Sequence, residues 1–101
     1  MPWTIYSVPS SKKAELDAAL ADDLVSRQSH TVRAASALGG PADRTYVLIE
    51  GSTDGIGRAN TLLEPVGSRV AGAEGEALFQ KFKDEQESAS AGMGLFFTED
   101  A

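Results

Sequence analysis

The sequence predicts one α+β domain in which a four-stranded sheet is combined with helices. Short segments rich in aromatic and β-branched residues alternate with longer segments whose apolar residues recur every three or four positions. The chain has 101 residues, 42% of them hydrophobic and 24% charged, which suits one domain and leaves too little length for a second core. It contains no cysteine, so disulfides and thiolate metal ligands play no part in its folding.

The first strand and the first helix are predicted near the N-terminus. Residues 3–8 are rich in aromatic and β-branched side chains, and Pro9 ends the run, which favours a strand. Ser10 and Ser11 then offer an N-cap for a helix over residues 12–27, which contains strong helix formers and neither glycine nor proline. Leucines four residues apart give this helix one apolar stripe: Leu16, Leu20 and Leu24.

The second and third strands are predicted as a hairpin. Over residues 30–38 the helical stripe is lost and the side chains alternate, which predicts a strand. Residues 39–43 form a Gly-Gly-Pro-Ala-Asp turn segment that leads into a third strand at residues 44–50. Because residues 46–49 are continuously apolar, this strand should lie centrally in the sheet or be covered on both faces.

A second helix and a short strand follow the hairpin. Gly51 ends the third strand, and Ser52 or Thr53 caps a helix over residues 54–63. The apolar face of this helix consists of Ile56, Ala59 and Leu63. Residues 67–71, Gly-Ser-Arg-Val-Ala, are the candidate for a fourth strand.

The last part of the chain is predicted to form a helix over residues 73–91, followed by an apolar tail. The apolar face of this helix consists of Leu78, Phe79 and Phe82. The tail segment 93–97, Met-Gly-Leu-Phe-Phe, should be hidden from water, either as an edge strand or against another subunit.

The order of these elements predicts a specific arrangement. Four strands and two crossover helices in the order β-α-β-β-α-β, with right-handed crossovers and both helices on one face, define the ferredoxin-like fold. We therefore predict one ferredoxin-like α+β sandwich over residues 1–101, with an additional C-terminal helix and the apolar tail.

Charge and hydropathy exclude two classes of partner. Nine Lys and Arg against fifteen Asp and Glu give a net charge of -6, and the cations are scattered, which argues against nucleic-acid binding. The N-terminus has no basic leader, and no apolar run approaches the roughly 18 residues that span a bilayer. We expect a soluble, cytoplasmic protein that binds neither nucleic acid nor membranes.

One motif points to a cofactor. Gly51, Gly55 and Gly57 have the spacing Gly-x-x-x-Gly-x-Gly between an apolar strand and a helix. Residues 46–59 resemble the cofactor-binding segment of the short-chain dehydrogenase/reductase family. The resemblance implies a parallel nucleotide-binding fold in which backbone N–H groups at the helix N-terminus hold a pyrophosphate.

The rest of the chain departs from that family. Only 44 residues follow Gly57, too few for the remaining β-α units, and no Tyr-x-x-x-Lys is present. Two interpretations follow. In the first, the glycines serve geometry alone, with tight turning and close approach of helix and sheet. In the second, an anion or nucleotide binds at the turn, and the candidate ligand-binding residues are Gly51, Ser52, Thr53, Gly55, Gly57 and Arg58.

Few other residues suggest chemistry. His30 is the only histidine, so we expect no metal site and no His-based catalytic pair within the chain. A cleft between sheet and helices is conceivable, lined by Trp3, Tyr6, His30 and Arg33. Trp3 and Tyr6 fall on opposite faces of their strand, so at least one of them should be core.

No nucleophile-base pair, metal set or complete cofactor site can be assembled from these residues, so the sequence alone does not define the function. The leading hypothesis is a small self-associating binding or regulatory module, a homodimer with no cofactor and with a small-molecule or protein partner. The alternative is a nucleotide-binding or cofactor-free enzyme of the dimeric ferredoxin-like class. It would use the turn at residues 51–58 or a cleft between subunits.

Overall fold

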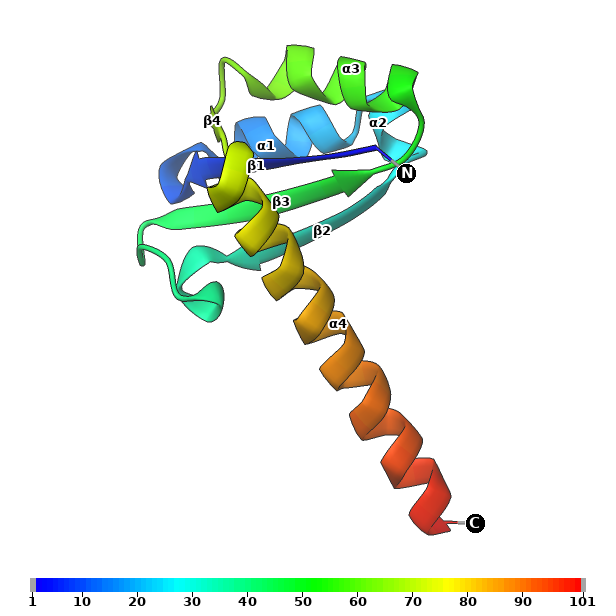
Figure 1. Cartoon of the computed structure of the whole chain (residues 1–101). Coiled ribbons are helices and arrows are strands. Elements are labelled where there is room, and N and C mark those ends of the chain that lie inside the picture. The colour runs from blue at the N-terminus through cyan, green and yellow to red at the C-terminus, as the bar shows by residue number, and fades with distance from the viewer. Residues whose placement is uncertain (1, 101) are drawn as a thin grey trace.

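The computed structural model describes residues 2–100, and it describes side chains as far as residue 86. A four-stranded antiparallel sheet carries helices on both faces (Figure 1). Its elements follow in chain order: β1 (Trp3–Pro9), η1 (Ser10–Lys12), α1 (Lys13–Leu20), α2 (Asp23–Ser26), β2 (Ser29–Ala34), η2 (Ala35–Leu38), β3 (Arg44–Glu50), α3 (Thr53–Leu63), β4 (Ser68–Arg69) and α4 (Gly72–Asp100).

The strands are ordered β2-β3-β1-β4, and every neighbouring pair is antiparallel. β3 therefore lies inside the sheet, paired along its length with β1 and β2. Its apolar residues Val47, Leu48 and Ile49 are all buried, which confirms the prediction made from its continuous apolar run.

One face of the sheet, which we call the helical face, is covered by α1, α2 and α3 (Figure 1). Side chains alternate along each strand, so every second strand residue contributes to this face. Together with the apolar sides of the three helices they form one buried cluster: Tyr6, Val8, Leu16, Ala19, Val25, Val47, Ile49, Ile56, Ala59 and Leu63.

The opposite face, which we call the α4 face, is covered by α4 and η2. Its buried cluster consists of Ile5 and Leu48 from the sheet, Leu38 from η2, and Leu78 and Phe82 from α4. The predicted apolar side of the last helix is confirmed, because Leu78 and Phe82 are buried and Phe79 packs against this cluster.

The helix predicted over residues 12–27 is divided. α1 ends at Leu20, and Asp22 starts α2 by accepting hydrogen bonds from the backbone N–H groups of Leu24 and Val25. The prediction of one continuous helix was wrong because the Asp22 carboxylate satisfies N–H groups that a continuous helix would use internally. The expected N-caps were also wrong, since residues 10–12 form a 3-10 turn without a side-chain cap.

The strand predicted over residues 30–38 is shorter than expected. β2 ends at Ala34, and Ala35–Leu38 form η2, whose residues Ala35 and Leu38 are buried. Three-residue spacing places these two side chains on one side of a 3-10 turn, and Gly39 ends it with a φ of 82°. Alanine favours strands weakly, so the alternation of small residues was not enough to extend β2.

The later elements agree more closely with prediction. α3 begins at Thr53 with Ser52 as its N-cap, and its three predicted apolar residues are buried. The predicted strand at 67–71 is reduced to β4, two residues long. α4 continues to Asp100, so residues 93–97 are helical and the edge-strand option is not observed. Their side chains lie outside the described residues.

Candidate functional site

The glycine-rich turn leads from β3 into α3, and its cap is formed by Ser52. The Ser52 Oγ accepts a hydrogen bond from the Gly55 N–H at 3.0 Å, and the Ser52 carbonyl accepts one from the Ile56 N–H at 2.9 Å. The Gly55 N–H is one of the helix N-terminal groups that the dehydrogenase resemblance offers to a phosphate, and it already has a protein partner, whereas the Ile56 bond is the first regular bond inside α3.

The side chain of Gln28, between α2 and β2, lies against this turn. Its Oε1 accepts a hydrogen bond from the Ser52 N–H at 2.9 Å, and its Nε2 donates to the Leu24 carbonyl at 3.0 Å. A Cβ at Gly51 would lie 1.9 Å from the Gln28 Oε1, and a Cβ at Gly55 would lie 2.2 Å from the Gln28 Cδ. Glycine at these two positions makes room for Gln28, which agrees with the geometric interpretation.

The remaining residues of the motif behave differently. A Cβ at Gly57 would meet nothing within 4 Å, and nothing in the structure explains a glycine there. Thr53 is exposed at the start of α3. The carboxylate of Glu50, one residue before the motif, is engaged on the α4 face, where it accepts from the Lys83 Nζ at 2.8 Å.

Arg58, the one cation of the motif, pairs with Asp22 across the gap between α3 and the start of α2. Its Nη2 lies 3.1 Å from the Asp22 Oδ1. The hydrogen bond from Arg58 lowers the pKa of the Asp22 carboxyl, and the same hydrogen bond raises the pKa of the Arg58 guanidinium. Asp22 thus competes with any anion for Arg58.

The sheet around the turn is not the one that the resemblance implies. A dinucleotide-binding fold needs β3 among parallel neighbours, whereas both neighbours of β3 are antiparallel to it. The parallel arrangement that the dehydrogenase resemblance implies is therefore absent from the described sheet.

The four residues considered for a cleft are not brought together. Tyr6 is fully buried on the helical face, whereas Trp3 lies on the α4 face, where it stacks on Phe79 with ring centroids 4.6 Å apart. His30 is exposed at the start of β2, and Arg33 pairs with Glu85 of α4. The expectation that Trp3 and Tyr6 occupy opposite faces is confirmed.

Sequence reasoning missed a polar cluster beneath α3. The Thr4 Oγ1 and the Tyr6 hydroxyl both donate to the Asn60 Oδ1 at 2.9 Å. Burial raises the pKa of Tyr6, so its hydroxyl stays protonated and acts as a donor. The cluster joins β1 to α3 and supplies no exposed reactive group.

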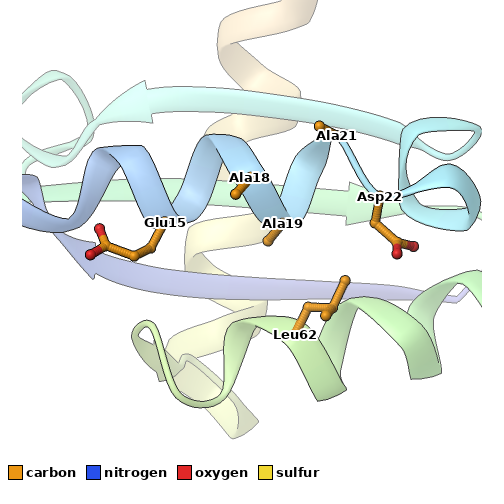
Figure 2. A pocket seen from close by; sticks show the side chains of 6 residues that line it. All are labelled: Glu15, Ala18, Ala19, Ala21, Asp22 and Leu62. Atoms are coloured by element: carbon orange, nitrogen blue, oxygen red, sulfur yellow. The ribbon is translucent and has the colours of Figure 1, made fainter.

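A shallow groove of about 380 Å³ runs along the outside of the helical layer, between α1 and α3 (Figure 2). Figure 2 shows three alanines and Leu62 along it, with Glu15 and Asp22 at its two ends. The groove exists because alanine side chains leave the space between the two helices unfilled. Its lining residues include no Ser, Thr, Cys or Lys nucleophile that a general base could activate.

On the other face, polar contacts attach α4 to the sheet at successive points. The Lys81 Nζ donates to the Leu38 carbonyl at 3.1 Å, and Lys83 pairs with Glu50. Further along, Glu85 pairs with Arg33, and the Gln86 Nε2 donates to the Thr31 Oγ1 at 3.2 Å. These contacts fix where α4 lies and in which direction it runs.

The part of the chain that the structure describes contains no group of three or more His, Asp or Glu side chains placed to hold a metal ion. None of its helices has the length and hydropathy of a bilayer-spanning segment.

Comparison with protein-family models, with curated proteins and with solved structures gives no match for this chain.

Proposed function

We propose that this chain is a small, non-catalytic binding or regulatory module of the ferredoxin-like type that works as a homodimer. The strand order β2-β3-β1-β4 and the antiparallel pairing of every neighbour support the ferredoxin-like assignment. So does the position of α1 and α3, the two crossover helices, on one face of the sheet.

The observation that carries the self-association proposal is the length of α4 relative to the sheet. Gln86, the last residue with a described side chain, contacts Thr31 on the edge strand β2. The helix backbone continues to Asp100, and Figure 1 shows it passing beyond the sheet. Those 14 residues extend about 21 Å at the usual helical rise.

The sequence of this projecting part favours burial in an interface. Its segment Met93 to Phe97 contains Met, Leu and two Phe within five residues. Apolar residues so concentrated at the end of a surface helix typically mark a protein-protein contact. A second copy has the same segment, so that in a two-fold dimer each α4 buries the apolar segment of the other.

The described residues support a non-catalytic role. In the region resolved with side chains, the candidate residues for a cleft lie on different faces, and the groups of the glycine-rich turn are engaged with Gln28, Ser52 and Asp22. We place the module in the cytoplasm, acting without a cofactor on a small-molecule or protein partner.

Light scattering on the full chain tests the proposal. We expect a dimer at micromolar concentration, and we expect Phe96→Glu to shift it to monomer because a buried carboxylate without a partner opposes association. Thr98→Glu adds the same charge two residues away and serves as the matched control, which should remain dimeric. A monomer in the unmodified chain at high micromolar concentration overturns the proposal.

The alternative function, a nucleotide-binding or cofactor-free enzyme, depends on Gly51, Ser52, Thr53, Gly55, Gly57 and Arg58 or on an intersubunit cleft. Titration with NAD, NADP and adenine nucleotides, followed by the amide resonances of residues 51–58, tests the turn. Shifts at millimolar ligand would favour the alternative.

A further inference from the structure

The two edges of the sheet differ in what they offer to another strand. β4, at one edge, has two residues. β2, at the other, has six residues, all paired with β3 on one side. In the described part of the chain no strand pairs with the other side of β2. A strand of this length with an open side is a template for strand addition.

β2 lacks the devices that usually protect such an edge. Its sequence, Ser-His-Thr-Val-Arg-Ala, contains no proline and no lysine. Its one arginine, Arg33, is drawn to Glu85 and to the Val32 carbonyl, so its charge is neutralised within the molecule. Glu85 and Gln86 of α4 contact this strand on the α4 face, through Arg33 and Thr31.

α4 crosses the strands in the direction of this edge. Its contacts pass in order from β1 to β3 to β2, through Trp3 with Phe79, Glu50 with Lys83 and Thr31 with Gln86. From Phe79 to Gln86 a helix rises about 10.5 Å, which is close to two strand spacings of ~4.8 Å each. The helix therefore leaves the sheet over β2 and projects past that same edge (Figure 1).

The residues that follow this crossing are small. Positions 88–92 read Ser-Ala-Ser-Ala-Gly, and the apolar segment 93–97 comes after them. Small residues permit a close approach of two helix axes, because axial separation depends on the side chains at the contact.

From these features we propose that two copies pair antiparallel through β2, forming one continuous eight-stranded sheet with both α4 helices on the same side. The inference rests on the proposed self-association and specifies its interface. A two-fold axis perpendicular to the sheet makes two β2 strands antiparallel and maps each α4 face onto the same side. Each projecting helix then crosses onto its partner's α4 face and runs antiparallel to the other α4. The small residues lie at the crossing, and the apolar segment lies over the partner.

Single-cysteine cross-linking tests this interface, because the chain has no cysteine of its own. A cysteine is placed in turn at residues 29, 30, 31, 32 and 34 of the full chain, leaving Arg33 to its contact with Glu85. Ser68→Cys on β4 is the matched control at the opposite edge. Disulfides need Cβ atoms about 3.5–4.5 Å apart, so only positions next to the two-fold axis should cross-link.

We expect one or two neighbouring β2 positions to form disulfide-linked dimer at least about tenfold faster than Ser68→Cys. Thiols held at an interface react at an effective concentration in the millimolar range, against micromolar protein. Hydrogen exchange on the unmodified chain gives an independent measurement. The amides of β2 that do not bond β3 should gain protection as the protein concentration rises, whereas those near β4 should not.

The outcomes separate this inference from the function on which it rests. A dimer in which no β2 position exceeds Ser68→Cys, and in which β2 exchange is independent of concentration, overturns the continuous sheet and leaves self-association standing. Equal cross-linking at both edges overturns the two-fold arrangement. A monomeric chain overturns both proposals.

Discussion

The two faces of the sheet are closed in different ways. On the helical face, three helices bury ten side chains in one cluster, and the Thr4, Tyr6 and Asn60 hydrogen bonds join strand to helix beneath them. On the α4 face a single helix contributes two buried side chains, Leu78 and Phe82, and polar contacts surround them.

The difference distinguishes contacts that bury the sheet from contacts that orient α4. Partly exposed ion pairs such as Arg33 with Glu85 contribute little to stability, with a median near 0–1 kcal/mol. Their positions along α4 nevertheless determine where the helix crosses the sheet and which edge it passes. The helical face thus has the larger buried cluster, whereas the α4 face combines a smaller buried cluster with polar contacts spaced along one extended helix.

The largest effect is expected from Phe82→Ala, which tests whether α4 is an integral part of the fold. Phe82 is 1% exposed in the α4-face cluster, and removing a buried Phe side chain costs about 3–5 kcal/mol. Urea unfolding monitored by circular dichroism measures the loss. Phe79→Ala, at a half-buried position, is the control and should cost less. If the two variants lose equal unfolding free energy, or if Phe82→Ala loses less than about 1 kcal/mol, α4 is not an integral part of the fold.

A smaller effect is expected at the glycine-rich turn. The test is whether the change in unfolding free energy caused by Gly55→Ala reverses its sign when Gln28 is removed. Gly55→Ala should destabilise the chain by about 1 kcal/mol: the new Cβ displaces Gln28 and its two hydrogen bonds, roughly 0.5–1.5 kcal/mol each, while alanine gains about 1 kcal/mol in helix propensity. In a Gln28→Ala background the same substitution should be neutral or stabilising, since alanine is favoured over glycine in helices by about 1 kcal/mol.

Gly57→Ala is the matched control for that experiment. It lies in the same helix with open space around it, so it should stabilise the chain with or without Gln28. If Gly55→Ala behaves like Gly57→Ala in the unmodified background, then room for Gln28 is not the reason for the glycine. Urea midpoints of the six combinations decide between these results.

The smallest effect concerns the pairing of Arg58 with Asp22. The pKa of Asp22 is lowered in the folded state, so its contribution is present above the ordinary carboxyl pKa and is lost as the pH falls through the lowered value. Stability should therefore decrease more between pH 7 and pH 3 in the unmodified chain than in Arg58→Met. Urea unfolding at both pH values measures this, and an identical decrease would show that the pair contributes nothing.

Much of the fold was predictable because local and tertiary preferences agree in it. β3 combines a continuous apolar run with flanking turn residues, and its observed bounds, Arg44–Glu50, are those predicted. α3 has a serine cap and a clear apolar face, and its prediction differs from the structure by one residue.

The errors occurred where one pattern fits two structures. Leu16, Leu20 and Leu24 keep helical spacing across the break, so the stripe does not reveal that Asp22 starts a new helix. Gly92 and Gly94 suggested the end of the last helix, yet α4 continues, because glycine inside a helix costs only about 1 kcal/mol.

The candidate site was predictable only in part. Close approach of helix and sheet was expected at Gly55 and Gly57, but Gly57 has open space around it, and the group that lies against Gly55 is the side chain of Gln28. Gln28 lies more than twenty residues earlier, and one polar side chain in a loop carries no periodic signal. An Asp-x-Leu-Val pattern at residues 22–25 was the one local sign of the Asp22 cap.

The brevity of β4 limits how far such molecules can join. A sheet grows into a fibre only when both of its edges accept strands, so that each added molecule presents a fresh edge to the next. Here one edge ends in the two-residue strand Ser68–Arg69, which offers an incoming chain few backbone groups. If two copies pair through β2 as proposed, growth stops after that one step, because the outer strands of the pair are too short to accept another molecule.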